Sequence, residues 1–459
     1  MLRACITIEE EVGIRALAVI AEGFAAQART VAYALGGSYI PIMEYPGVIP
    51  NDSLDTFRDK VATQMWPEFM RALEMAQDPA VIEAEPDPAP TDIVFRGDLD
   101  AVQDYFVEQL WSDGLPIIPP TIERVEAFLR CTARDRQEVL GTLLPEFRSA
   151  TVWNVAVNGV MAGCRPEYMP VLIAIVECLA DPLFRIQDGG STPGWEPLVT
   201  VSGPIVTALD FNTRGGQLRV GRRANSSIGR FTRLYMRNIP GLRQWPSLTD
   251  KAAIGSSFNM VLAEGDDFLD DLGWQPHRVD RGFARSQSVV TVQSVHQISG
   301  PIYSGVSGGS RAEDHLDTLS YYLASTSGPY AFTGLSDGVW CPLLVMSPSV
   351  AKQLSEFGID KPAIRQYLFE HARIPRHLYD WIAPQNGATD FRVEQQLLRD
   401  DLPDEYRRSV AQATDGTVPV MIRAESLGIV VAGDPARNQS RFYMNNHKQG
   451  VPVSRAISD

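Results

Sequence analysis

The chain has 459 residues, 44% of them hydrophobic and 21% charged, and its formal net charge at neutral pH is −15. That length is too great for one compact core and predicts two or three domains, and the composition is that of a globular chain. A surface this acidic repels phosphate backbones and anionic lipid, which argues against nucleic acid or a membrane surface as a partner.

The cysteines and apolar segments indicate the compartment. The five cysteines are scattered and never at CxxC spacing, which fits a reducing environment better than a disulfide framework or a zinc site. The first residues lack a basic region followed by an apolar core, so we expect no signal peptide. The longest apolar stretch, Met169 to Ala180, is too short to span a bilayer. We therefore expect a cytoplasmic protein.

Residues 1–77 are predicted to alternate strand and helix. The elements, in chain order, are strand Arg15–Ile20, helix Phe24–Leu35, strand Tyr39–Met43 and helix Leu54–Met75. A Gly-Gly pair ends the first helix, and an Asn-Asp-Ser run caps the second. This β-α-β-α order predicts a partial α/β domain built on an open parallel sheet.

The rest of the chain is predicted to form a linker and a larger domain. Residues 78–91 are rich in proline and acid and are interpreted as a linker. Residues 92–459 are predicted to form a large mixed α/β catalytic domain, with a polar, flexible tail after Asn445. The clearest apolar strands of this domain are Leu198–Ser202, Ser288–Val295, Leu343–Met346 and Gly428–Ala432.

The clearest candidate site is the glycine- and arginine-rich stretch 212–230. It follows an apolar strand and leads into a helix whose first turn is expected near Ser226 and Ser227. Glycines let backbone N–H groups approach a ligand, a helix N-terminus favours negative charge, and guanidinium groups bind carboxylate or phosphate with two bonds. The alternative is a solvated loop whose arginines pair with the many acids of the chain. The substrate-binding residues predicted here and beside it are Arg165, Asn212, Arg223, Asn225, Ser226, Ser227 and Arg230.

A second candidate surrounds Cys164. Pro166 suits the first turn of a helix that runs to about Leu179. Cys164 would lie just before that helix and beside Arg165, where a thiolate is favoured, and Glu167 would be a candidate acid or base. The alternative is an ordinary packed core in which Glu167 only caps the helix.

A third candidate combines Glu264, in Glu264-Gly-Asp-Asp267, with His277. Carboxylates near a histidine suit acid–base catalysis, although a solvated acidic loop has the same pattern. No metal-binding spacing and no nucleotide fingerprint occur, so we predict no metal and no cofactor.

Two loops are weaker candidates. Gly305-Val-Ser-Gly-Gly309 superficially fits the nucleophile-elbow pattern but lacks the strand before it, so a serine hydrolase is disfavoured. The segment Gly433–Arg437 follows an apolar strand, and loops in that position commonly line ligand crevices.

Short segments in both predicted domains resemble segments of a known family. The segments in the first domain are Gly13-Ile14, Glu22-Gly-Phe24, Leu35-Gly36, Tyr45-Pro46 and Asp52-Ser53. Those in the second are Asp113–Thr121, Ala162–Pro170, Arg223–Arg230 and Asp280–Phe283. Residues 13–75 resemble the C-terminal half of the UGSC domain, named after a selenocysteine-Gly-Ser-Cys motif. Residues from about 100 to 444 resemble the large protein that accompanies this domain or is fused to it.

The resemblance implies an α/β fold and thiol or selenol chemistry, but this chain departs from the pattern. The family's redox motif lies upstream of the helix that begins here near Leu2, and Cys5 inside that helix does not replace it. Where the large protein tends to carry a cysteine, this chain has Asn259-Met-Val-Leu262. Cys164 is therefore the thiol that lies on a matching segment. An upstream segment or a partner chain would supply the missing motif.

Three functions follow from these patterns. The leading prediction is a non-redox lyase, hydratase or hydrolase that holds a small anionic substrate and uses Glu167, Glu264 or His277 to move a proton, with Cys164 as a possible nucleophile. The first alternative is a thiol-dependent reductase in which Cys164 works with a thiol from a partner chain. The second is an inactive scaffold subunit. The truncated sheet also predicts a homo- or hetero-oligomer formed through the N-terminal domain.

Overall fold

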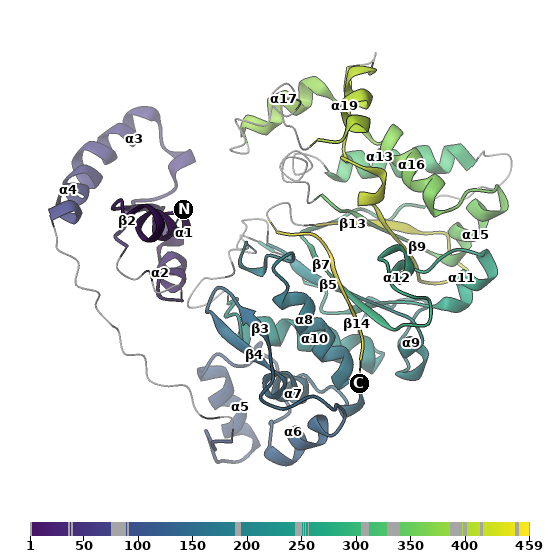
Figure 1. Ribbon diagram of the computed structural model, residues 1–459, viewed down its shortest axis with the longest axis horizontal. Coiled ribbons are helices and arrows are strands. Elements are labelled where there is room, and N and C mark those ends of the chain that lie inside the picture. The colour runs from purple at the N-terminus through teal and green to yellow at the C-terminus, as the bar shows by residue number, and fades with distance from the viewer. Residues whose placement is uncertain are drawn as a thin grey trace. The chain divides into compact units, whose positions relative to one another are not determined.

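The computed structural model describes residues 2–34, 37, 40–74, 89, 91–188, 194–243, 250, 252, 254–255, 257–303, 312–327, 340–385, 397, 402–413, 416–445 and 449–458. These form two compact units by their internal contacts. The first comprises residues 1–114, 142–149 and 236–251, and the second comprises residues 115–141, 150–235 and 252–459. Most of the predicted linker lies outside the described residues. The α/β fold class is confirmed (Figure 1).

The first unit contains a small parallel sheet covered on both faces. Its elements are α1 (Leu2–Thr7), η1 (Ile8–Val12), β1 (Ala18–Ala21), η2 (Glu22–Phe24), α2 (Ala25–Ala34), β2 (Ile42–Tyr45), η3 (Ile49–Asn51), α3 (Leu54–Lys60), η4 (Val61–Met65), α4 (Trp66–Glu74) and α5 (Leu99–Glu108). Strands β1 and β2 pair in parallel, as predicted. Ala18 packs in a cluster with α1 and α2, whereas Tyr45 packs in one with Met65 of η4, because successive strand residues point to opposite faces.

The second unit is built on two mixed four-stranded sheets. One has the order β14-β7-β5-β6 and the other β12-β9-β13-β8. Their strands are β5 (Glu196–Ser202), β6 (Val261–Glu264), β7 (Val289–Val295), β8 (Gln297–Ile298), β9 (Leu343–Met346), β12 (Gly428–Val431), β13 (Ser440–Met444) and β14 (Val453–Ala456). The four strands predicted from apolar runs are confirmed. The predicted flexible tail is wrong for β14, which pairs with β7 because Val453 is buried there.

Helices surround the two sheets. In chain order they are α6 (Ile122–Leu129), α7 (Val152–Met161), η5 (Pro166–Tyr168), α8 (Met169–Ala180), η6 (Ile186–Asp188), α9 (Ile205–Ala208), α10 (Arg223–Asn238), α11 (Asp266–Leu272), α12 (His277–Asp280), α13 (Ala312–Ser327), α15 (Pro348–Glu356), α16 (Lys361–His371), α17 (Arg376–Gln385), α19 (Asp404–Ala411) and η7 (Ala424–Ser426). The remaining short strands are β3 (Val139–Leu143), β4 (Arg148–Thr151), β10 (Arg373–Pro375) and β11 (Thr417–Pro419).

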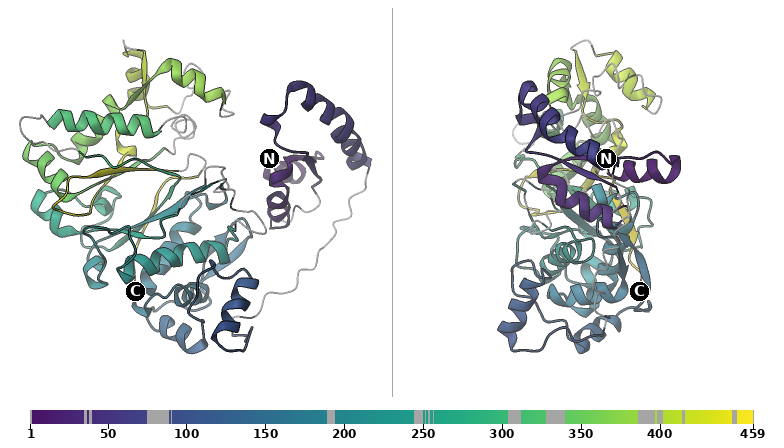
Figure 2. Two further views of the ribbon diagram at one scale, coloured as in Figure 1. Left: turned by 180° about the vertical axis from the view of Figure 1, so that it is seen from behind. Right: turned by 90° about the vertical axis from the view of Figure 1, so that its left-hand side faces the viewer.

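The sheets and helices of the second unit stack in four layers. Helix α8 packs on β7 and β14, and α13 packs on β13. The views from the front and from behind agree that these helices lie on opposite sides of the strands (Figures 1 and 2). Between the sheets lies a small core that includes Leu198 and Leu262 from one sheet and Leu343 and Tyr443 from the other. A larger core lies on the other face of the β9 sheet. There Leu344 and Met346, which share one face of β9, pack against the helices.

The two halves of the second unit have the same topology. In each, an edge strand (β6 or β12) runs parallel to its neighbour (β5 or β9), which is followed by an antiparallel strand (β7 or β13). The chain then crosses to the other half: β8 follows β7 but pairs with β13, and β14 follows β13 but pairs with β7. Each half therefore completes its sheet with a strand from the other.

The sequence repeats where the topology does. Ala284-Arg-Ser-Gln-Ser288 precedes β7, and Ala436-Arg-Asn-Gln-Ser440 leads into β13. A Gly-Asp pair follows β6 at Gly265 and β12 at Gly433. These short matches lie at corresponding places in the shared strand order.

Candidate functional site

Two loops of the second unit meet near the carboxyl ends of the parallel strands β6 and β12. The Gly433 N–H donates to the Thr213 carbonyl at 3.0 Å. A Cβ atom at position 215 would lie 3.4 Å from the Cβ of Asp434. A glycine at this position therefore lets the two loops lie close together. Loops at the carboxyl ends of parallel strands are the usual place for ligands in α/β sheets.

Two side chains attach the glycine-rich loop to the free edge of β6. The Gln217 side chain accepts from Ala263 N at 2.8 Å and donates to the Thr213 carbonyl at 3.1 Å. Asn225, which is fully buried, donates to the Val261 carbonyl at 2.8 Å and accepts from Asn212 N at 2.8 Å. These amides take the place of a neighbouring strand, because edge N–H and C=O groups need partners. The loop is thereby fixed beside the sheet.

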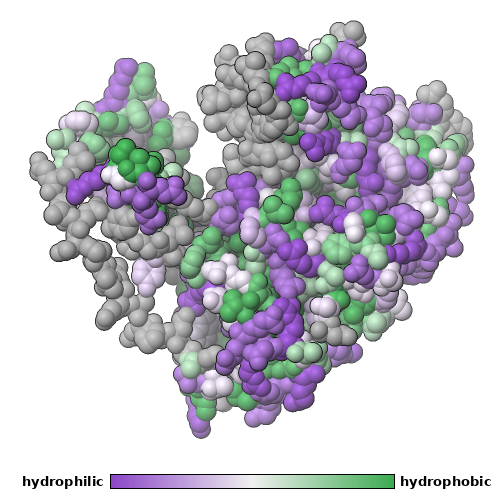
Figure 3. Space-filling view, in the orientation of Figure 1, coloured by the Kyte–Doolittle hydropathy of each residue, from purple (hydrophilic) through white to green (hydrophobic). Residues whose placement is uncertain are grey.

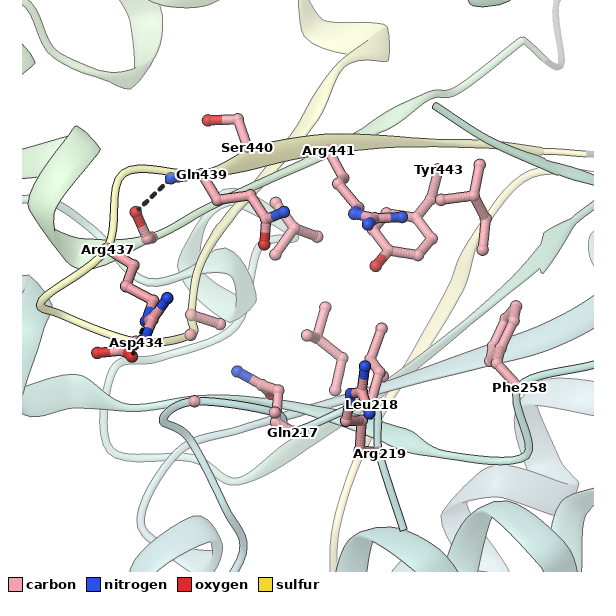
Figure 4. A pocket seen from close by; sticks show the side chains of 18 residues that line it. Gln217, Leu218, Arg219, Phe258, Asp434, Arg437, Gln439, Ser440, Arg441 and Tyr443 are labelled. Carbon is pink, nitrogen blue, oxygen red and sulfur yellow. Dashed lines mark hydrogen bonds and ion pairs between the residues drawn. The ribbon is translucent and has the colours of Figure 1, made fainter. Parts of the chain in front are cut away.

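A cavity of about 530 Å³ opens beside this loop. Figure 4 shows the Arg219 and Arg441 side chains pointing toward one another across it. Among the described residues, neither guanidinium has an ion-pair partner, whereas Arg214 and Arg222 of the same loop pair with Asp267 at 3.1 Å and Asp210 at 2.9 Å. Two guanidinium groups facing one space can hold a carboxylate or phosphate between them.

The strand period explains why β13 presents Arg441 and Tyr443 to the cavity. Both point to the face between the sheets, while Phe442 and Met444 pack in the outer core. Burial raises the pKa of Tyr443 to about 12, against an opposing effect of Arg441. The hydroxyl therefore stays protonated at neutral pH and can donate a hydrogen bond.

The opposite end of the cavity is polar. Asp434 accepts an N–H bond from Ala436 at 2.9 Å and lies 3.2 Å from Arg437, whose side chain is 82% exposed. Ser347, at the N-cap of α15, accepts from Gln439 N at 3.2 Å and also lines the cavity. The helix N-terminus adds a favourable field for an anion. Among the described residues that line the cavity, Asp434 carries the only carboxylate.

The structure brings several predicted residues together at a different place. Helix α10 begins at Arg223, so its first turn includes Ser226, close to the predicted place. Arg223 donates to the Gly163 carbonyl at 3.1 and 3.2 Å, and Arg230, two turns later, donates to the Pro116 carbonyl at 3.0 Å. The helical period places both on the same face as Ser227, toward the segment that carries Cys164. Both arginines therefore bind backbone carbonyls.

The predicted thiolate at Cys164 is wrong. Cys164 is 5% exposed, and burial raises its pKa to about 12 despite a hydrogen bond from Ser227 and the charges of Arg223 and Arg230. Burial penalises the charged form more than these partners favour it. Nearby, Arg165 and Glu167 form a surface pair at 3.5 Å with both side chains about half exposed.

The third predicted pair lies in a buried network that joins the two halves. Glu264 accepts bonds from His277 N at 2.7 Å and from Ser202 Oγ at 3.0 Å, and its carboxylate lies 3.8 Å from Lys361 Nζ. Lys361 also donates to Asp280 at 3.2 Å and to the Ile429 carbonyl at 3.1 Å. Burial raises the pKa of Glu264 and holds the pKa of His277 well below its usual range. Neither residue lines the Arg219–Arg441 cavity.

The remaining predicted residues brace loops. Asn212 donates to the Gly215 carbonyl at 3.1 Å and accepts from Arg214 N at 2.9 Å, and Ser226 Oγ accepts from Gly221 N at 3.3 Å. The Ser-Gly pattern at 305–309 lies outside the described residues. Sequence reasoning missed Arg441 and Tyr443, although an arginine within the apolar strand Ser-Arg-Phe-Tyr-Met is an anomaly that pointed to a pocket.

The described residues contain no group of three or more His, Cys, Asp or Glu that could hold a metal ion. No described helix is both long and apolar enough to cross a membrane. Figure 3 shows mostly hydrophilic residues on the visible face, interrupted by smaller hydrophobic groups. No protein-family model, curated protein or solved structure matches the chain. The resemblance to the UGSC family stays a prediction.

Proposed function

We propose that this chain is an enzyme that binds a small carboxylate- or phosphate-bearing substrate between Arg219 and Arg441 and acts on it by non-redox, acid–base chemistry. The observation that carries the proposal is that two guanidinium groups point into one cavity without an acidic partner among the described residues. The chain has 56 aspartate and glutamate residues against 41 lysine and arginine residues, so acidic partners for arginines are abundant in it. Arginines that face a cavity without one favour an external anion.

Two groups in the cavity support acid–base chemistry. The Tyr443 hydroxyl, which burial keeps protonated at neutral pH, can donate a hydrogen bond to negative charge that develops on the substrate. The Asp434 carboxylate, at the end of the cavity nearer Arg437, suits a proton acceptor. An anchored anion beside one hydrogen-bond donor and one proton acceptor is the arrangement that a lyase or hydratase requires.

Ligand binding tests the anion site. We expect inorganic phosphate or citrate to bind the wild-type chain in a calorimeter, and Arg219→Ala and Arg441→Ala each to weaken that binding at least tenfold. Arg222→Ala is the matched control, because Arg222 is in the same loop but pairs with Asp210. A crystal soaked with small carboxylates and phosphates should show density between Arg219 and Arg441. Equal binding by all three variants would contradict the proposal.

Proton exchange tests the chemistry without a known substrate. A mixture of small carboxylates in deuterated water should exchange carbon-bound protons next to the carboxylate when the wild-type chain is added, as followed by proton NMR. Asp434→Asn and Tyr443→Phe should reduce the exchange rate at least a hundredfold while citrate binding persists. If citrate binds but no carbon-bound protons exchange, the chain is an anion-binding protein, and the proposal that it is an enzyme is contradicted.

The reductase alternative depends on Cys164. A thiol with a pKa of about 12 is a poor nucleophile at neutral pH, which disfavours it. Cys164→Ser should leave proton exchange largely intact, whereas a reductase would lose all turnover. Exchange by the purified chain alone would also exclude the scaffold alternative.

We propose in addition that the first unit mediates assembly. Among the described residues, β1 and β2 pair only with each other, so both outer edges of this sheet are open for a further strand. Sedimentation equilibrium at micromolar concentration should give a mass of at least two chains. A monomer would contradict this assembly.

A further inference from the structure

The cavity between the arginines has an apolar wall as well as a charged one. Leu218, Phe258, Leu262, Ile298 and Val345 all line it, and they pack in or against the core between the two sheets. A site for a fully hydrated ion such as phosphate gains nothing from this wall. Apolar lining with a few polar groups is the usual form of a site for an organic ligand.

The polar and apolar groups lie at different ends. Figure 4 shows Asp434, Arg437 and Gln439 toward one end and Phe258 toward the other, with Arg219, Arg441 and Tyr443 between them. A ligand whose anionic group is held by the arginines would therefore place one side against polar groups and the other against an aromatic ring. The volume, about 530 Å³, admits a ligand much larger than phosphate.

From this arrangement we propose that the ligand is an amphiphilic anion: a carboxylate or phosphate group joined to an aromatic or branched apolar body that packs against Phe258. The inference rests on the proposed function and narrows its substrate class. The apolar body gains affinity by leaving water, while the arginines fix the orientation of the anionic group.

A series of four probes tests this class by calorimetry. The probes are inorganic phosphate, butyrate, 4-phenylbutyrate and the neutral 4-phenylbutanol. We expect 4-phenylbutyrate to bind at least tenfold more tightly than butyrate and than 4-phenylbutanol. Equal affinity for butyrate and 4-phenylbutyrate would overturn this inference and leave the proposed function standing. No binding of any anion, or equal binding of the alcohol and the acid, would overturn the proposed function itself.

Two variants locate the apolar body. Phe258→Ala should weaken 4-phenylbutyrate binding at least fivefold and leave butyrate binding unchanged, which also shows that the variant is folded. Leu218→Ala should also weaken 4-phenylbutyrate binding and leave butyrate binding unchanged. It provides the test if Phe258→Ala fails to fold. Phe357→Ala is the matched control, because Phe357 is 55% exposed and does not line the cavity. Unchanged 4-phenylbutyrate binding in both cavity variants would overturn the placement.

Discussion

The loop after β6 and the loop after β12 occupy corresponding places in the two halves of the second unit, but their aspartates have different partners. Asp266 forms two bonds, at 2.7 and 2.6 Å, with Arg278, whose side chain is fully buried. Asp434 lies beside Arg437, which is almost fully exposed. The same Gly-Asp pair thus contributes to an ion pair with a buried arginine in one half and lines the larger cavity in the other.

The cavities beside these loops differ in the same way. The cavity at the first loop, about 340 Å³, is lined by Asp210, Asp266 and Asp267, and each of these acids is paired with an arginine. The larger cavity has arginines that no described acid neutralises. The comparison teaches that two loops in corresponding places can differ in whether their charges are paired within the chain.

The largest expected effect comes from breaking the buried pair. Arg278→Leu leaves the Asp266 carboxylate without a cation and removes bonds to Ser202 and Arg285, so unfolding free energy should fall by about 3–5 kcal/mol. Urea unfolding followed by circular dichroism measures this. Adding Asp266→Asn should restore part of the loss; if it restores nothing, an unpaired charge is not the cause.

The loop that walls the larger cavity depends on one buried amide. Asn225→Ala leaves Val261 O and Asn212 N without their partner, which should cost about 1–3 kcal/mol and weaken citrate binding. Ser226→Ala in the same helical turn is the control, because its hydroxyl accepts one long, exposed bond. Thermal unfolding and calorimetry give both quantities. Equal effects of the two variants would show that the loop does not depend on Asn225.

A pH test distinguishes the outer helices of the two halves. Helix α13 carries the buried His315, and α8, in the corresponding place, has no histidine. Burial lowers the pKa of His315 to about 4, so the unfolded chain binds more protons below pH 6.5. The contribution of neutral His315 to the unfolding free energy is therefore complete above pH 6.5. It is lost as pH falls toward 4, by up to about 1.4 kcal/mol per pH unit.

His315→Leu should make stability less sensitive to acid over that range, as measured by the thermal midpoint at several pH values. The exposed His377 provides the control, and His377→Gln should leave the pH dependence unchanged. An identical acid dependence in His315→Leu and wild type would rule out a contribution from this residue.

The smallest expected change in unfolding free energy is at the exposed pair of Arg437 and Asp434. Arg437→Ala removes a surface ion pair with Asp434 and should change unfolding free energy by less than about 1 kcal/mol. The same urea experiment measures it against Arg278→Leu. A loss as large as that of Arg278→Leu would mean that the two loops are equally structural and would remove the contrast between the halves.

The sequence by itself determined the α/β class and the main strands of this protein. Apolar runs such as Leu343–Met346 became strands at the predicted residues, and Ser53 caps α3 by accepting from Thr56 N, because these signals act within a few residues. The glycine- and arginine-rich stretch was also predicted to lead into a helix, and α10 begins within it at Arg223.

Only the tertiary structure decided which arginines face a cavity. Arg223 and Arg230 bind backbone carbonyls. Arg219 instead lines the same cavity as Arg441, which lies more than two hundred residues later in the sequence. The thiol of Cys164 was expected to ionise from its place before a helix, but burial outweighs that local field. Burial and long-range pairing depend on how distant segments pack, and no local pattern of residue types contains that information.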